Sequence, residues 1–163
     1  METGVATVSV RLLTTYGPGR DKGFTSAPTT ALKAAALNCA YAVPYQGREH
    51  YHYVHDVAAG FAGCAMDPFS GYDVFNLRGE SVENAEFVEM ICRQAEALGL
   101  GSPAVTIAED AQRLPFVCDL DEDGILAAFP NMPRTSLEQG VTESLKTFKA
   151  MADSGELTAA DIQ

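Results

Sequence analysis

The stretch that decides the fold is VATVSVRLLTTY, residues 5–16. Residues 5–13 are rich in β-branched and aliphatic side chains, a composition typical of a buried strand. The Gly- and Pro-containing segment YGPGRDKG, residues 16–23, then predicts a loop. Residues 28–38 are typical of a helix with proline in its first turn. A strand, a loop and a helix in this order indicate an α/β fold.

The rest of the chain continues this alternation of strands and helices. The apolar positions of residues 81–98 fall on one stripe at helical spacing, and Gly99 follows where a C-cap is expected. Ser136 and Gln139 form a capping-box pattern for a last helix that runs to Asp153. We predict a single α/β domain over residues 1–155 and a frayed tail at 156–163. The other expected strands are 49–54, 73–77, 104–107 and 114–118, and the other expected helices are 56–66 and 121–129.

The charge balance restricts the partners of this chain. Its 11 Lys and Arg against 22 Asp and Glu give a net charge of −11. Such an acidic surface repels phosphate backbones and anionic lipids, so we expect neither nucleic acid nor membrane as a partner. A small anion such as a sugar nucleotide needs only one or two well-placed cations. The N-terminus does not resemble a signal peptide, and the cysteines are well separated, which predicts reduced thiols in a cytoplasmic protein.

Two local motifs are better explained as ordinary structure. Residues 17–23 (GPGRDKG) miss the dinucleotide-binding spacing by one residue, and Pro18 removes an N–H that a phosphate would need. Residues 119–124 (DLDEDG) copy the first half of a calcium loop, but Pro130 occupies the position that should hold a bidentate Glu. We therefore interpret them as a turn and an acidic helix start.

Three histidines, His50, His52 and His55, lie close together in the sequence. On a strand, the first two share one face, so two metal ligands could converge. A zinc site would still need a third ligand from elsewhere. Hydrogen-bonded imidazoles are the simpler interpretation, and we predict no metal site.

Taken in order, four stretches resemble the NAD-dependent epimerase/dehydratase family, the extended short-chain dehydrogenase/reductase enzymes that act on nucleotide sugars. Residues 11–18 (RLLTTYGP) resemble the family's R-x-x-N/T-x-Y-G-P stretch. Residues 51–58 (YHYVHDVA) are similar to D-F-x-Y-V-x-D-V-A, and residues 74–82 (VFNLRGESV) to V-F-N-I-G-x-G-x-S-V. Residues 133–141 (PRTSLEQGV) are similar to P-x-T-S-L-E-E-G at the start of the final helix. The order and spacing hold across nearly the whole chain.

The resemblance implies a partial Rossmann-type fold. Residues 5–13 and 73–77 would be the last two parallel strands of the cofactor sheet, and the remainder would be the small α/β substrate-binding lobe. It also implies where a nucleotide sugar would lie: beside the end of the first strand, wrapped by the following loop, with an arginine near the diphosphate. The substrate-binding residues predicted in this way are Thr14, Tyr16, Arg20, Ser26, Thr29 and Arg48.

The chain also departs from the family pattern. Glu49 stands where the family often has its diphosphate arginine, His50 replaces a common Asp, and position 14 is Thr where many members use Asn. No tyrosine is followed by lysine four residues later, and the glycine-rich cofactor loop is missing. The complete family enzymes use NAD. We expect this chain alone to have no catalytic residues, to hold no cofactor and to be inactive.

Three functions remain open. The chain could be a substrate-binding lobe that works with a cofactor-binding partner lobe, or a stand-alone module that binds a nucleotide sugar. It could also be a non-catalytic homo-oligomer, because the strand at 5–13 would lack a sheet neighbour and an unpaired apolar edge favours a homodimer. Saturable binding of a UDP-sugar separates the first two hypotheses from the third.

Overall fold

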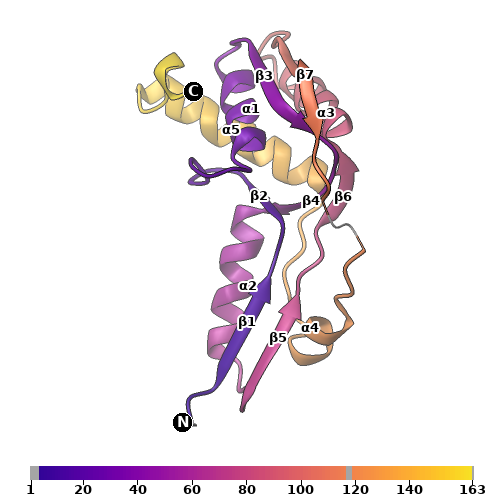
Figure 1. Cartoon of the computed structure of the whole chain (residues 1–163). Coiled ribbons are helices and arrows are strands. Elements are labelled where there is room, and N and C mark those ends of the chain that lie inside the picture. The colour runs from indigo at the N-terminus through magenta and orange to yellow at the C-terminus, as the bar shows by residue number, and fades with distance from the viewer. Residues whose placement is uncertain (1–3, 117–118, 163) are drawn as a thin grey trace.

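The computed structural model describes residues 4–116 and 119–162 and is an elongated α/β molecule (Figure 1). The predicted α/β class is confirmed. The strands are β1 (Thr7–Arg11), β2 (Thr14–Tyr16), β3 (Tyr41–Gln46), β4 (Arg48–Tyr53), β5 (Tyr72–Asn76), β6 (Glu80–Glu83) and β7 (Val105–Arg113). The helices are α1 (Ala27–Ala36), α2 (Val54–Met66), α3 (Asn84–Ala97), α4 (Asp123–Ala128), α5 (Leu137–Ser154) and the 3₁₀ helix η1 (Ala159–Asp161).

The strands pair into small sheets that are mostly parallel. β1 pairs with β5 in parallel, as the sequence predicts for residues 5–13 and 73–77. β2 and β4 are parallel, β4 and β6 are antiparallel, and β3 and β7 are parallel. The predicted strand 5–13 is therefore shorter than expected. Its last residues, Leu12 and Leu13, carry the chain from the β1–β5 pair to the sheet of β2.

The larger hydrophobic core lies among α1, α3, α5 and the strands β2–β4 and β7. Helix α1 is alanine-rich, and small side chains allow neighbouring helices to approach closely. Leu32, Ile91 and Leu145 are fully buried where the three helices meet. The rings of Tyr51 and Phe87 stack with their centroids 4.2 Å apart and hold α3 against β4.

A second, smaller core lies under the β1–β5 pair. Phe75 and Leu77 from the β5 segment pack on Ile125 and Phe129 from the α4 segment, and Cys64 of α2 contacts the same cluster. Both helices therefore cover the same face of this pair. Figure 1 shows its other face open toward the viewer. Parallel sheets usually have both faces covered, so this part of the fold has room for further structure.

The structure differs from the sequence prediction in three places where strand pairing overrides the local pattern. Helix α3 begins at Asn84 instead of Ser81, because residues 81–83 belong to β6 and pair with β4. The sequence does not predict β3, which contains Pro44; the β3–β7 register shifts between Val43 and Tyr45 and accommodates this residue. Strand β7 replaces the two expected strands 104–107 and 114–118, of which residues 117–118 lie outside the described part.

The C-terminal helix matches its prediction more closely. The Ser136 side chain accepts a hydrogen bond from Gln139 N, and α5 ends at Gly155 with φ of +80°. Of the segment predicted to fray, the structure describes residues 156–162. Residues 159–161 form η1, and Leu157 is buried against the larger core. Contacts with the larger core therefore extend to Ile162, the last described residue.

Candidate functional site

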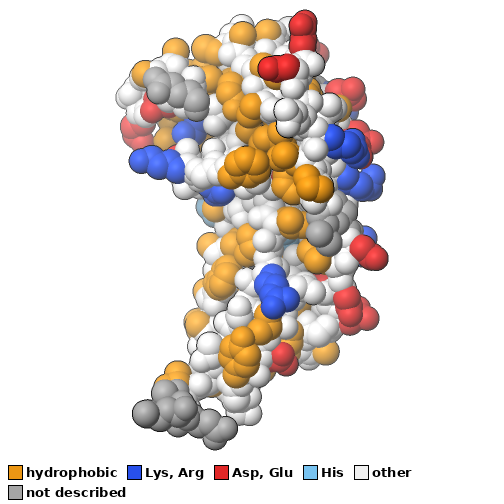
Figure 2. Space-filling view, in the orientation of Figure 1, with side chains coloured by type: hydrophobic (Ala, Val, Ile, Leu, Met, Phe, Trp, Pro, Cys, Tyr) orange, Lys and Arg blue, Asp and Glu red, His pale blue; other side chains and the backbone are white. Residues whose placement is uncertain are grey.

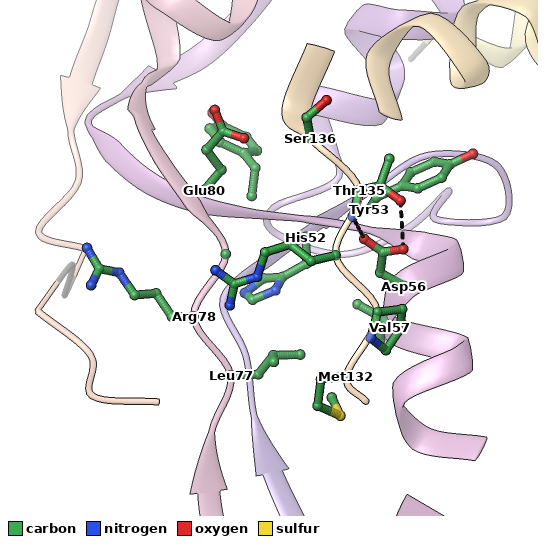
Figure 3. A pocket seen from close by; sticks show the side chains of 14 residues that line it. His52, Tyr53, Asp56, Val57, Leu77, Arg78, Glu80, Met132, Thr135 and Ser136 are labelled. Carbon is green, nitrogen blue, oxygen red and sulfur yellow. Dashed lines mark hydrogen bonds between the residues drawn. The ribbon is translucent and has the colours of Figure 1, made fainter. Parts of the chain in front are cut away.

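A pocket of about 410 Å³ lies where β4, the start of α2, the β5–β6 connection and residues 132–136 meet (Figure 3). Asp56 accepts hydrogen bonds from the backbone N and the hydroxyl of Thr135, at 2.5 and 2.8 Å. Glu80 accepts one from Leu137 N at 2.9 Å, at the start of α5. Both carboxylates therefore fix the wall of the pocket through hydrogen bonds to the segment that leads into α5.

His52 is a buried side chain of this pocket, with 5% of its surface exposed. Its Nε2 accepts a hydrogen bond from Leu13 N at 3.4 Å. Burial is the main reason why the pKa of His52 is lowered to about 4, and the neighbouring His50 adds to this effect. The imidazole is therefore neutral near pH 7, which agrees with its role as an acceptor.

This depressed pKa predicts acid destabilisation. Unfolded histidine titrates near 6.5 and folded His52 near 4, so the neutral side chain contributes stability above pH 6.5 that is lost as the pH falls toward 4. The expected loss is about 3 kcal/mol. Urea denaturation of the wild type and of His52→Gln across this range measures it. The variant should show a flatter pH dependence, and parallel curves would contradict the assignment.

Glu49 lies at the centre of a buried polar network between β2, β4 and α3. It is fully buried, it accepts hydrogen bonds from the Thr14 hydroxyl and from Asn84 Nδ2, and Tyr51 Oη donates to it at 3.3 Å. Burial raises the pKa of Glu49, and these hydrogen bonds oppose the increase. Asn84 Oδ1 and Tyr45 Oη are buried and have no hydrogen-bond partner among the residues that the structure describes. The network binds three elements together, and the Thr14 hydroxyl is engaged inside it.

Two more of the predicted substrate-binding residues also make internal contacts. Tyr16 is 1% exposed, and its hydroxyl donates to Leu137 O at 3.4 Å. The Thr29 hydroxyl accepts a hydrogen bond from Gly17 N at 3.2 Å. With Thr14, these residues fix the end of β2 and the start of the following loop.

The same loop brings the predicted residues Arg20 and Ser26 together. Arg20 Nη2 donates to Thr25 Oγ1 at 3.3 Å, and Ser26 Oγ donates to Gly23 O at 2.8 Å. Gly23 has φ of +110°, a conformation that favours glycine. The loop therefore has a defined shape that presents the arginine at the surface.

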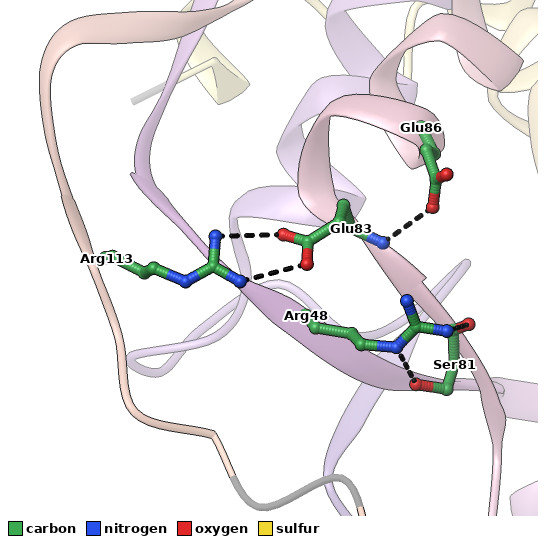
Figure 4. A network of polar contacts seen from close by, with 5 residues as sticks. All are labelled: Arg48, Ser81, Glu83, Glu86 and Arg113. Atoms are coloured by element: carbon green, nitrogen blue, oxygen red, sulfur yellow. Dashed lines mark hydrogen bonds and ion pairs between the residues drawn. The ribbon is translucent and has the colours of Figure 1, made fainter.

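The remaining predicted residue, Arg48, lies at the start of β4 in a separate polar cluster (Figure 4). Its guanidinium donates to Ser81 Oγ and to Ser81 O, both at 3.0 Å. The cross-strand partner of Arg48 is Glu83, which forms a bidentate ion pair with Arg113 at 2.9 and 3.1 Å. Arg113 lowers the pKa of Glu83, and Arg48 contributes to the same shift. Two guanidinium groups thus flank one carboxylate.

Sequence analysis did not identify Arg113. It lies at the end of β7, a strand whose extent the sequence did not predict, and it reaches Glu83 only because β3–β7 and β4–β6 pair side by side. No local pattern around Arg113 signals this contact.

An aromatic cluster adjoins the two arginines. Phe24 is 76% exposed and stacks on Tyr45 with centroids 6.1 Å apart, and Phe116 contacts Tyr45 edge-on at 6.0 Å. Gly47 joins this cluster to the arginines, because it lies against Phe116 and directly precedes Arg48. Figure 2 shows hydrophobic side chains across the upper part of one face, with Lys and Arg on both sides. Phe24 is the exposed ring of this cluster, and an exposed ring beside guanidinium groups suits a ligand that combines a planar base with phosphates.

The described part of the chain contains neither a cluster of potential metal ligands nor a helix that could span a membrane. Within residues 4–116 and 119–162, no group of three or more His, Cys, Asp or Glu side chains is arranged to hold a metal ion. His50 Nδ1 lies 2.9 Å from Gly79 O, so two of the three histidines are in hydrogen-bonding contact with the backbone. None of the described helices is long and apolar enough to cross a bilayer.

No protein-family model and no curated protein sequence matches the chain. Solved structures do match. A partial-consensus L-threonine 3-dehydrogenase has a TM-score of 0.69 and 17% identity, over 87% of this chain and 48% of that one. UDP-glucose 4-epimerase from Thermotoga maritima, solved with UDP-glucose, has a TM-score of 0.64 and 18% identity, over 89% of this chain and 46% of that one.

UDP-glucose 4-epimerase from Thermus thermophilus, solved with NAD, has a TM-score of 0.65 and 21% identity, over 87% of this chain and 46% of that one. The chain spans about half the length of the structures that it matches. The remaining half of each is not represented in the match. This chain therefore has the fold of about half of an NAD-dependent epimerase or dehydrogenase of this group.

Proposed function

We propose that this chain binds a nucleotide sugar and acts as the substrate-binding part of an epimerase-like protein. The observation that carries the proposal is the pair of guanidinium groups, Arg48 and Arg113, on either side of Glu83. Arginine pairs bidentately with phosphate, and a diphosphate could replace Glu83 as the partner of Arg113. Phe24, whose ring stacks on the buried Tyr45, supplies the adjoining aromatic surface for a base.

The proposal predicts a specific effect of removing each arginine. Arg48→Ala and Arg113→Ala are each expected to weaken UDP-glucose binding at least about tenfold, since a charge-assisted phosphate contact is lost. Glu83→Gln is expected to strengthen binding, because it removes the carboxylate that competes for Arg113. Isothermal titration with UDP-glucose measures all three.

Arg93 on α3 provides the matched control, since it is an exposed arginine outside this cluster. Arg93→Ala removes the same charge and should leave the affinity unchanged. If all three arginine variants bind UDP-glucose equally well, the ligand does not use this cluster, and the proposal is wrong.

Catalysis would require a second lobe. Hydride transfer in the resembled family uses NAD and a Tyr-x-x-x-Lys pair, and this sequence contains no such pair. We infer that the chain is inactive alone and works with a cofactor-binding lobe, so that NAD binds the completed protein. The test is to add a separately produced NAD-binding lobe of a UDP-glucose 4-epimerase and to measure UDP-galactose formation. Activity only in the mixture supports the inference.

A cytoplasmic location is a further part of the proposal. Within the described residues, Cys39, Cys64 and Cys92 form no disulfide, which is the usual state of thiols in a reducing compartment. A non-catalytic homo-oligomer is the second candidate function. It is favoured by the outer edge of β1, which pairs with no other described strand.

A further inference from the structure

The pocket of about 410 Å³ at the start of α2 has the size of a small-molecule site. None of the residues assigned to nucleotide-sugar binding lines it. Its walls are joined by hydrogen bonds. Asp56 holds Thr135 in the segment before α5. Glu122 accepts a hydrogen bond from Arg78 N at 3.2 Å and forms an ion pair with Arg134 at 2.7 Å. All of these contacts lie within the described part of the chain, so they define the pocket without a partner.

His52 offers this pocket an unused hydrogen-bond donor. The side chain lines the pocket and is buried (Figure 3). Its Nε2 accepts from Leu13 N, and a neutral imidazole that accepts through one nitrogen carries its proton on the other. Among the residues that the structure describes, none accepts a hydrogen bond from this Nδ1–H. A ligand with an acceptor in the pocket would satisfy it.

Arg134 adds a cation beside this donor. Its charge acts on His52, whereas Arg78 extends away from His52 in Figure 3. Within the described residues, Glu122 engages only Nη2 of Arg134, so Nε and Nη1 remain for a ligand. A carboxylate has two oxygens and can therefore accept from His52 and Arg134 together.

Two carboxylates, Asp56 and Glu80, line the same pocket, and Figure 3 shows His52 between them. Both oxygens of Asp56 accept from Thr135. Glu80 uses Oε2 for Leu137 N, and none of the described residues donates to its Oε1. The pocket thus keeps an anionic acceptor as well as cationic donors. Its two arginines and two carboxylates balance in charge, which favours a zwitterion over a ligand with net charge.

We propose that this pocket binds an amino acid with an apolar side chain. The carboxylate of the ligand accepts from His52 Nδ1–H and pairs with Arg134, and its ammonium group donates to Glu80 Oε1. The side chain of the ligand packs on the apolar part of the wall, where its burial adds to the affinity. This part consists of Val57, Leu77, Met132 and Pro133.

Ligand analogues test the proposal on the wild-type chain. Isothermal titration should show saturable binding of L-leucine. Leucinamide keeps the ammonium group and lacks the carboxylate, and 4-methylpentanoate keeps the carboxylate and lacks the ammonium group. Each should bind at least about tenfold more weakly than L-leucine, because one charged contact is lost. If L-leucine does not bind to saturation, or if the three ligands bind equally well, the proposal is overturned.

Two variants assign the contacts. Arg134→Ala should weaken L-leucine binding at least about tenfold and leave leucinamide unchanged, because leucinamide lacks the group that Arg134 binds. Glu80→Gln keeps an acceptor for Leu137 N; it should weaken L-leucine by a similar factor and leave 4-methylpentanoate unchanged. Arg93→Ala, which removes an exposed arginine of α3, should change none of these affinities. L-leucine binding that is the same in all three variants would contradict the assignment.

UDP-glucose separates this proposal from the proposed function. Neither Arg134 nor Glu80 belongs to the cluster of Arg48, Glu83 and Arg113, so both variants should bind UDP-glucose as the wild type does. Loss of UDP-glucose binding in Arg134→Ala would mean that the two sites are one, and the proposal of a separate amino-acid site would be wrong.

Discussion

Replacing Glu49 by alanine is expected to lower the free energy of unfolding by about 4 kcal/mol. The side chain is fully buried, and it accepts hydrogen bonds from Thr14, Tyr51 and Asn84. Alanine would leave these donors without an acceptor and would create a cavity between β2, β4 and α3. Unsatisfied buried donors and cavities are both among the costliest single defects in a protein core.

Glutamine at the same position is the matched control. Glu49→Gln keeps the shape and an acceptor oxygen, so its cost should be about 1 kcal/mol or less. The folded state raises the pKa of Glu49 above its ordinary 4.5. The stability that protonated Glu49 contributes to the fold is therefore fully present below pH 4.5 and is lost as the pH rises through the pKa of the folded state. The stability of Glu49→Gln relative to wild type should rise over that range in urea denaturation. If Glu49→Ala were as stable as wild type, the network would have no structural role.

Gly79→Ala is expected to destabilise the protein by about 3 to 4 kcal/mol, at the upper end of overpacking effects. A Cβ on Gly79 would lie 2.8 Å from the carbonyl carbon of Tyr51 and closer still to its oxygen. These atoms belong to the backbone of β4, so they cannot move aside as a flexible side chain could. Relief would require separation of β6 from β4, which carries Arg48 and Glu49.

A helical glycine with free space provides the control for Gly79→Ala. Gly63 in α2 has no atom within 4 Å of an added Cβ, so Gly63→Ala should be neutral or stabilising by about 1 kcal/mol. Chemical denaturation of both variants gives the comparison. A Gly79→Ala protein within error of Gly63→Ala would show that the backbone of β4 can shift at little cost.

The sequence predicts local structure in this protein better than it predicts pairing. The cap of α5 at Ser136 depends on the three residues that follow it, and the structure contains it as predicted. The break at Leu12–Leu13 has no local signal, because the sequence on both sides of it has strand-like composition, with Val8 and Val10 before it and Thr14 and Thr15 after it. The strand β3 was missed because Pro44 removes a backbone donor, and only its register shift with β7 makes the strand feasible. Such features depend on residues that are far away in the chain.

In the candidate site, too, the sequence predicts less where a contact depends on strand pairing. The resemblance suggested Arg48, although this residue lies just before the matching stretch 51–58 and the family often has its arginine one residue later, where this chain has Glu49. Arg113 reaches Glu83 through two separate strand pairings, and neither was predicted in full. The buried position of Glu49 also depends on tertiary structure, since an acidic residue on a strand normally faces solvent.

The most direct test of the proposed function is isothermal titration of the purified chain with UDP-glucose and, separately, with NAD. The proposal predicts saturable binding of UDP-glucose that Arg113→Ala weakens, and no binding of NAD. If UDP-glucose does not bind, or if NAD binds to saturation, the chain is not a nucleotide-sugar-binding half of this fold.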